Sequence, residues 1–278
     1  MSTLIPCTVQ IVTRNNAAGL QKCLDSLTEF SEVIVQDGYS TDGTREIAAK
    51  YPNVKLMDQD RRYLNEEGRI VDFASIRNLS IAAAKYDWVF VVDGDEHVHA
   101  DMIAEVRSIV AKNQPGIWQA FRRFFVDGQP IMHSALYPAI QIRLFHRSQT
   151  TGYGKAVHER LSLKPGVVPK MLQAELPVPL PAPSALTAKN ERYLFMEVKR
   201  AGVLSWGRWF RWVFLWKLRT IAGLLLRLCR IWLVPRKGKR LPLAYEFQYI
   251  GHAFATLYSM CPPMARRYLA KEATASHT

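Results

Sequence analysis

The sequence predicts an α/β fold, a mixed and mostly parallel sheet flanked by helices, followed by a C-terminal helical segment. Short apolar runs alternate with helical patterns through residue 160, which is typical of parallel β-α-β units. The run Trp88 to Val92 is apolar throughout, which indicates a strand buried on both faces. Beyond a proline-rich run the composition becomes basic and rich in tryptophan. We therefore expect an α/β domain at 1–183 and a helical segment at 184–278.

The individual elements follow from local periodicity and from turn residues. We expect strands at 8–13, 33–36, 54–57, 88–92, 117–126 and 140–145. We expect helices at 18–27, 45–50, 72–84 and near 102–112. The polar turn at 38–44 leads into the second of these helices, and either Ser40 or Asp42 is its expected N-cap. The short connections between these elements favour parallel pairing.

Composition limits the classes of function. With 49% hydrophobic and 22% charged residues, the chain of 278 residues has the makeup of a folded protein with one substantial core. Its net charge of +13 points to a polyanionic partner: nucleic acid, anionic lipid or a phosphorylated substrate. The four scattered cysteines suit a reducing compartment, and no signal-peptide pattern opens the chain. We therefore expect a cytoplasmic location.

The strongest candidate site follows the strand at 88–92. Asp93, Asp95 and Glu96 bring three carboxylates within four residues, and Gly94 permits a tight turn between the first two. Like charges at this spacing repel unless a cation lies between them, and Mg²⁺ or Mn²⁺ prefers such oxygen ligands. Ligands of open α/β sheets bind at the carboxyl ends of strands. The pattern predicts a metal site at Asp93 and Asp95 that holds a phosphate-bearing partner.

The basic segment suggests contact with a membrane surface. No acidic residue occurs between residues 198 and 245. Trp206, Trp209, Trp212 and Trp216 recur every three or four residues, so we expect them on one helical face. The apolar stretches are too short to span a bilayer, whereas a basic, tryptophan-rich helix is typical of a membrane interface. We expect a peripheral location on the anionic inner face of the membrane. A soluble helix core is the alternative.

Taken together, the ordered motifs resemble those of a family 2 glycosyltransferase of GT-A fold. The motifs are Thr13-Arg14-Asn15, Asp37 with Ser40-Thr41-Asp42-Gly43-Thr44, Arg77-Asn78, and Asp93-Gly94-Asp95-Glu96. A later segment, Val157-His158-Glu159-Arg160-Leu161, is similar to a motif of the lipopolysaccharide-core glucosyltransferase branch. The resemblance covers the part that we expect to form the GT-A domain.

The resemblance implies inverting transfer of a sugar from a nucleotide-diphosphate sugar to a lipid-linked or cell-envelope glycan acceptor. Asp37 matches the acid that contacts the base or ribose, and Thr13 and Asn15 match the first-strand loop that touches the nucleotide. Arg77 matches a basic residue near the base or diphosphate. Asp93 and Asp95 match the motif that holds the metal of the donor. Asp37 is followed by Gly38-Tyr39 rather than by a second acid, so the resemblance names no nucleotide.

Such a transfer requires two catalytic groups. A divalent cation, Mg²⁺ or Mn²⁺, neutralises the charge that develops on the departing diphosphate. A general base takes the proton of the acceptor hydroxyl. Glu159 is the first candidate for this base and Glu96 the second, while His158 is a candidate contact to the diphosphate or the metal.

Two other classes of function stay open at this stage. A sugar-phosphate nucleotidyltransferase would carry a glycine-rich loop after its first strand, where this chain has Arg14-Asn15-Asn16; a phosphohydrolase would carry Thr or Val in place of His97. A non-enzymatic polyanion-binding protein would use the net charge instead. Because the basic residues are interleaved with an apolar helix, we expect no nucleic-acid partner.

Overall fold

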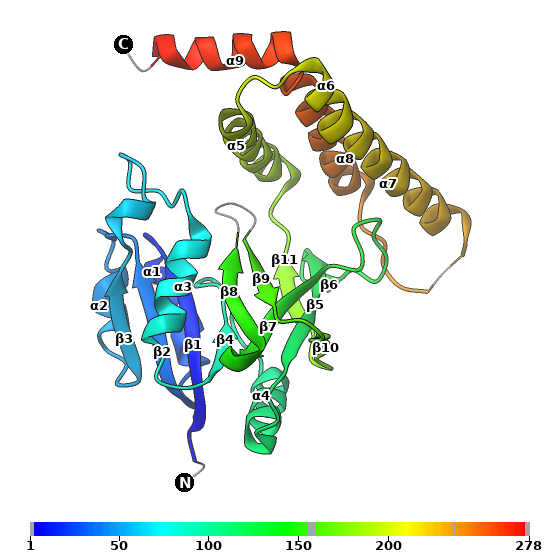
Figure 1. Ribbon diagram of the computed structural model, residues 1–278. Helices are drawn as coiled ribbons and strands as arrows, with labels where there is room; N and C mark the ends of the chain where they lie inside the picture. The colour runs from blue at the N-terminus through cyan, green and yellow to red at the C-terminus, as the bar shows by residue number, and fades with distance from the viewer. Residues whose placement is uncertain (1–2, 155–158, 236, 276–278) are drawn as a thin grey trace. The chain divides into compact units, whose positions relative to one another are not determined.

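The computed structural model describes residues 3–154, 159–235 and 237–275, and the chain forms two compact units (Figure 1). The first unit comprises residues 1–122 and 140–176, and the second comprises residues 123–139 and 177–278.

The first unit is built on a mixed, mostly parallel sheet. Its strands are β1 (Ile5–Thr13), β2 (Phe30–Asp37), β3 (Val54–Asp58), β4 (Trp88–Val91), β5 (Ile117–Val126), β7 (Ile140–His146) and β10 (Lys170–Met171). They lie in the order β10-β5-β7-β4-β1-β2-β3, and β7 runs antiparallel to both of its neighbours. The register pairs Thr13 with Asp37 and Asp37 with Asp58, so the carboxyl ends of β1, β2 and β3 meet at one edge. All predicted strands are confirmed, with ends shifted by a few residues.

Helices cover both faces of this sheet. On one face, α1 (Ala17–Asp25), α2 (Thr44–Ala48) and α4 (Ala100–Lys112) contribute to a core that also includes Val9 and Phe90. On the other face, α3 (Phe73–Ala83) and the hairpin β8 (Thr150–Gly154)–β9 (Arg160–Leu163) pack over a second core (Figure 1). Two short 3₁₀ turns, η1 (Arg61–Tyr63) and η2 (Arg147–Gln149), complete the unit. The predicted α/β class is confirmed.

The start of α2 differs from the prediction. The residue that precedes α2 is Gly43, in a left-handed conformation with φ 87°, so neither Ser40 nor Asp42 is the N-cap. Asp42 nevertheless accepts a hydrogen bond from the Thr44 backbone N–H at 3.2 Å, which satisfies a donor of the first turn. The left-handed conformation is least costly for a residue without a Cβ, and Gly43 supplies it.

The second unit consists mainly of helices. The short strands β6 (Gln129–Pro130) and β11 (Leu176–Pro179) pair with β5. The helices are α5 (Pro183–Ala201), α6 (Trp206–Arg208), the π-helical stretch η3 (Trp209–Phe214), α7 (Leu215–Leu233), α8 (Leu243–Ser259) and α9 (Pro262–Ala275). Helices α7 and α8 pack against each other through a core that includes Ile221, Leu224 and Ile250 (Figure 1).

The tryptophans of the basic segment do not share one face. Trp206, Trp212 and Trp216 are exposed, at 60%, 73% and 62% of their surface, whereas Trp209 is half-buried. The Trp209 indole N–H donates to the Leu257 carbonyl at 3.3 Å. The π-helical stretch explains the difference, because its wider turns shift the phase of the side chains that follow. The three exposed rings lie outside any core of the described chain.

None of the helices in the described part of the chain is both long enough and apolar enough to cross a bilayer.

A buried carboxyl holds a loop in the second unit. Glu246 on α8 is 2% exposed, and its Oε1 accepts a hydrogen bond from the Ala135 backbone N–H at 2.9 Å. Burial raises the pKa of Glu246 above its ordinary 4.5, although Arg227 opposes this shift.

A Glu246→Gln variant tests that shift. Gln keeps the acceptor for Ala135 but removes the charge. Above its folded pKa, Glu246 is ionised in the folded and unfolded states, so the buried charge lowers the free energy of unfolding of wild type. As the pH falls toward 4.5, the folded state takes up its proton first and wild type recovers.

We therefore expect Glu246→Gln to have a higher free energy of unfolding than wild type at pH 7. The difference at pH 7 should be about 1.4 kcal/mol for each unit by which the pKa of Glu246 is raised, and it should disappear near pH 4.5. Urea unfolding at both pH values measures the difference. The exposed Glu191→Gln on α5 is the matched control. A difference that does not change with pH would contradict the expectation.

Candidate functional site

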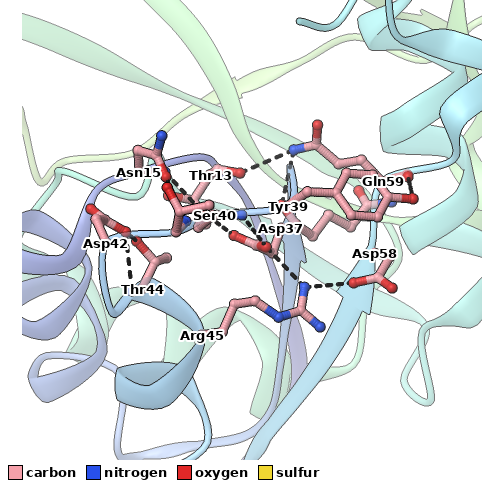
Figure 2. Close-up of polar contacts among 12 residues, drawn as sticks. Thr13, Asn15, Asp37, Tyr39, Ser40, Asp42, Thr44, Arg45, Asp58 and Gln59 are labelled. Atoms are coloured by element: carbon pink, nitrogen blue, oxygen red, sulfur yellow. Dashed lines mark hydrogen bonds and ion pairs between the residues drawn. The ribbon is translucent and has the colours of Figure 1, made fainter. Parts of the chain in front are cut away.

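At the edge where β1 and β2 end, Asp37 organises a loop (Figure 2). Its carboxylate is fully buried and accepts hydrogen bonds from the Ser40 backbone N–H and from Arg45 Nη1, both at 2.9 Å. The Ser40 hydroxyl donates to the other oxygen. Arg45 also donates to Asp58 Oδ1 at 2.6 Å, which ties the end of β3 to the same network. The contacts of Asp37 within the described chain therefore order the loop, and its contact to a base or ribose stays a prediction.

Hydrogen bonds from backbone N–H groups to side-chain oxygens join the loop at residue 15 to the loop at 40–44 (Figure 2). Asn15 has a left-handed φ of 48°, and its N–H donates to Ser40 Oγ at 2.8 Å. Its side-chain oxygen accepts from the Thr41 N–H at 2.9 Å. The Asp42 carboxylate accepts from the Ala17 N–H at 3.1 Å. The loop after β1 and the loop after β2 thus form one ordered rim.

A cavity of about 330 Å³ opens beside this rim. Its lining includes Arg14, Tyr39, Arg61 and residues 64–68. Tyr39 takes a left-handed φ of 58°, and its hydroxyl donates to the Gln59 carbonyl at 3.0 Å. The Arg61 guanidinium lies 4.7 Å from the centre of the Tyr39 ring, within cation–π range. The cavity therefore combines a flat aromatic surface with two arginines and with two acids, Glu66 and Glu67.

At the end of β4, the turn at Gly94 comes close to β1. A Cβ on Gly94 would lie 3.2 Å from Thr13 Oγ1, so only glycine allows this approach without displacement. Thr13 Oγ1 is buried and has no hydrogen-bond partner in the described chain. Asp95 is exposed, and no described side chain or backbone group donates to its carboxylate. An unpaired hydroxyl and an unpaired carboxylate thus flank the same turn.

Arg143, which the sequence analysis did not single out, is the main counter-ion of this turn. It lies on β7 with its side chain 1% exposed, and its two terminal nitrogens donate to the two oxygens of Glu96 at 2.9 and 2.7 Å. Arg143 Nη2 also lies 3.6 Å from Asp93 Oδ2. The signal for this role was a charged residue in the middle of an apolar strand, since a buried charge requires a partner.

Arg77 completes the charge network from α3. Its Nε donates to Glu159 Oε1 at 3.0 Å, and its Nη2 lies 3.7 Å from Asp93 Oδ1. The Arg77 guanidinium also lies 5.7 Å from the centre of the Tyr153 ring. The side chain of Arg77 is only 9% exposed, so these contacts fix its position. Asp93 therefore lies between two buried guanidiniums.

These charges act in opposite directions on the two neighbouring acids. Burial by itself would raise the pKa of Asp93. The guanidiniums of Arg143, Arg77 and Arg122 outweigh burial and lower that pKa below its usual value. For Glu96, burial and the charge of Asp93 raise the pKa despite the opposing Arg143. Asp93 is thus held as an anion beside the more readily protonated Glu96.

A divalent cation fits this arrangement only if the phosphate groups of a substrate supply some of its ligands. The described residues include no cluster of three or more side chains suited to a metal. Mg²⁺ is commonly bound by one or two carboxylates while substrate phosphates and water complete its shell. The unpaired, exposed Asp95 meets that requirement, and Asp93 adds a second carboxylate whose side chain is 40% exposed. The donor set therefore suits a cation that bridges protein and phosphate.

The predicted site residues fall into two groups within the first unit. Asp37 and Asn15 belong to the rim, whereas Arg77, Asp93, Glu96 and Glu159 form the charge network, and Thr13 lies between the two. His158 lies outside the described residues.

Comparison with protein families decides the assignment. The family model described as "Glycosyl transferase family 2" matches residues 8–161, more than half of the chain. The chain belongs to glycosyl transferase family 2. The mixed, mostly parallel sheet with flanking helices matches the GT-A fold expected for this family.

Two named glycosyltransferases are similar to part of the chain. Lipopolysaccharide core biosynthesis glycosyltransferase LpsC of Rhizobium meliloti is 24% identical over 168 residues, which cover 60% of this chain and 58% of LpsC. Glycosyltransferase SunS of Bacillus subtilis is 33% identical over 90 residues, or 32% of this chain and 19% of SunS. The chain therefore spans less than two thirds of the length of these relatives.

Two solved structures of glycosyltransferases also match the chain at low identity. Mannosyltransferase PcManGT from Pyrobaculum calidifontis, in complex with GDP-Man and Mn²⁺, is 18% identical, with a TM-score of 0.48 over 99% of this chain and 76% of that chain. S. aureus TarS in complex with UDP-GlcNAc is 13% identical, with a TM-score of 0.43 over 95% of this chain and 87% of that chain.

Because of this network, we expect removal of the Arg143 guanidinium to lower the free energy of unfolding. In an Arg143→Met variant, Glu96 loses its guanidinium while it stays largely buried. Loss of one partner of a buried ion pair costs about 3–5 kcal/mol, so we expect the free energy of unfolding to fall by that amount. In the double variant Arg143→Met/Glu96→Gln the unpaired charge is gone, and we expect at least half of the loss to be recovered. Urea unfolding measures both, and independent, additive effects would refute the pairing.

Proposed function

We propose that the chain is an inverting, metal-dependent glycosyltransferase that moves a sugar from a nucleotide-diphosphate donor to a membrane-linked glycan or lipid acceptor. The observation that carries this proposal is the turn at the end of β4. There Asp95 is exposed and has no partner in the described chain, and the turn that carries it lies against the orphan hydroxyl of Thr13 and follows Asp93.

The donor nucleoside, in this proposal, enters the cavity that Arg14, Tyr39 and Arg61 line. The Tyr39 ring offers a surface for stacking a base, and Arg14 and Arg61 offer donors to phosphate oxygens, although Glu66 and Glu67 line the same cavity. Thr13 and Asn15 contact the nucleotide from the loop after β1, and Asp37 supports this loop. The diphosphate then points toward Asp93 and Arg77.

Asp93 and Asp95 would hold the Mg²⁺ or Mn²⁺ ion of the donor. When bound, such an ion neutralises the charge of a departing diphosphate. Arg77 and Arg143 keep Asp93 ionised and oriented by their contacts at 3.7 and 3.6 Å. These contacts hold Asp93 in place before the donor arrives, whereas no partner in the described chain holds the Asp95 carboxylate.

Glu159 is the proposed general base for the acceptor hydroxyl. In the described chain its carboxylate accepts one hydrogen bond, from Arg77, and the other oxygen stays available. Glu96, the second candidate, accepts from both terminal nitrogens of Arg143 and from the Asp93 backbone N–H. Because these bonds occupy both oxygens of Glu96, Glu159 is better placed to take a proton. His158 stays a predicted contact to the diphosphate or metal.

The acceptor side of the proposal rests on the second unit. Exposed aromatic rings and basic residues alternate along α6, η3 and α7 without an acidic residue, as expected for a helix at an anionic membrane surface. LpsC, a relative, is named for lipopolysaccharide core biosynthesis, which favours a cell-envelope glycan as acceptor. The proposed location is cytoplasmic and peripheral, on the inner face of the membrane.

The Asp95→Ala variant is the direct test of the enzymatic proposal. Since Asp95 is exposed and unpaired, its loss should leave the free energy of unfolding unchanged while metal-dependent sugar transfer from a nucleotide-sugar panel falls at least about 100-fold. Titration with Mn²⁺ and nucleoside diphosphate, followed by electron paramagnetic resonance, should show weaker binding of the ion.

Glu46→Ala removes another exposed carboxylate, from α2, and serves as the control for net charge. We expect it to keep wild-type transfer and Mn²⁺ affinity. Undiminished transfer by Asp95→Ala would reject the proposed mechanism, and pyrophosphate release from a nucleoside triphosphate by wild type would favour a nucleotidyltransferase instead.

A second variant tests the membrane contact. Replacing Trp206, Trp212 and Trp216 together with Ser removes the three exposed rings without opening a core. Burial of such a ring contributes about 1.5 kcal/mol or more, so co-sedimentation with phosphatidylglycerol vesicles should weaken at least 100-fold. The exposed Val168→Ser of the first unit is the control. Equal sedimentation of the triple variant and wild type would exclude these rings as the contact.

A further inference from the structure

The second unit contains a basic cavity that the sugar-transfer proposal does not use. It has a volume of about 280 Å³ and lies between the loop at 132–137 and the face of α7 that carries Arg227, Arg230 and Ile231. All of its lining belongs to the second unit.

The loop side of this cavity is held in place by hydrogen bonds. The backbone N–H groups of Met132 and His133 donate to the Lys239 carbonyl at 2.8 and 3.2 Å, and the Leu241 N–H donates to the His133 carbonyl at 2.8 Å. The His133 imidazole Nε2–H donates to the Lys237 carbonyl at 2.7 Å. The wall is therefore formed before any ligand binds, which lowers the entropic cost of binding.

The opposite wall carries two positive charges, those of Arg227 and Arg230. Arg227 and Arg230 are three residues apart on α7 and therefore lie on the same side of the helix. No ion pair joins either guanidinium to a carboxylate in the described chain. The Glu246 carboxylate lies near Arg227, but it is buried and bound to the Ala135 N–H. Two forked donors that converge on one cavity suit phosphate oxygens.

The apolar surface beside Arg230 indicates where such a phosphate comes from. Leu226 and Leu233 lie four residues before and three residues after Arg230, so the three share one stripe of α7. The two leucines are 72% and 80% exposed. A free phosphate gains nothing from an exposed apolar surface. The acyl chains of a lipid phosphate can cover that surface and remove it from water.

We propose that the cavity between the loop at 132–137 and α7 binds the phosphate of a membrane-lipid headgroup, whose acyl chains pass over Leu226 and Leu233. This inference rests on the membrane association in the proposed function and adds to it a specific site. A general attraction of basic residues to an anionic surface would need no cavity and would not distinguish headgroups of equal charge.

The experiment uses the full chain and phosphatidylcholine vesicles that contain either phosphatidic acid or phosphatidylserine, matched in surface potential. We expect wild type to bind the phosphatidic acid vesicles at least about 10-fold more tightly, because a phosphomonoester accepts more charge-assisted hydrogen bonds. The variant R227Q/R230Q should lose this preference. The matched variant R208Q/R211Q, which removes two exposed charges from the preceding turns, should bind both vesicles more weakly and keep the preference.

Each other outcome is decisive. Vesicle binding by wild type without a headgroup preference overturns the cavity proposal and leaves the membrane association intact. Failure of wild type to bind any vesicle overturns both. If inorganic phosphate raises the melting temperature of wild type but not of R227Q/R230Q, and no headgroup preference exists, the cavity takes a soluble phosphate and the lipid assignment is wrong. Equal melting temperatures of the variants without phosphate confirm that both fold.

Discussion

Repulsion among the carboxylates at the end of β4 is the constraint on which the site depends. Asp93, Glu96 and Glu159 converge there, and the buried guanidiniums of Arg143 and Arg77 hold them together. These two arginines come from β7 and α3, so the site exists only once the sheet and its helical layer have formed. Asp95 is left without a guanidinium in the described chain, so the network has a surplus of negative charge where a cation-bridged phosphate would bind.

Local periodicity was enough to predict the sheet but not the network that its strands create. The strand at 88–92 was evident from its apolar run, and the carboxylates that follow it were evident as a site. Arg143 was visible only as a charge inside an apolar strand. Its pairing with Glu96 depends on the antiparallel pairing of β4 with β7, which brings together residues 47 positions apart in sequence. No spacing rule for a single element contains that information.

In the second unit, too, local periodicity predicted the helices but not the contacts between distant residues. The basic composition indicated helices, and helices are present. The stripe of tryptophans was predicted from the period of a regular α-helix. The π-helical stretch at 209–214 changes that period for the tryptophans after Trp209, and Trp209 itself is bound to the Leu257 carbonyl. The loop at 132–137 joins this unit from the middle of the sequence through Glu246 and Lys239. Contacts of such long range leave no local pattern to detect.

Tyr39 links local strain to the proposed donor site. A non-glycine residue with φ of 58° costs about 1–2 kcal/mol, and here the hydroxyl bond to Gln59 and the stacking with Arg61 offset that cost. Glycine at this position would remove the strain but also the aromatic surface of the cavity. Asp37 is fully buried and bound to Ser40 and Arg45, so its predicted contact to a base or ribose would share the carboxylate with these two partners. In the proposed enzyme, Tyr39 and Arg61 add an aromatic surface and a positive charge that the family resemblance did not single out.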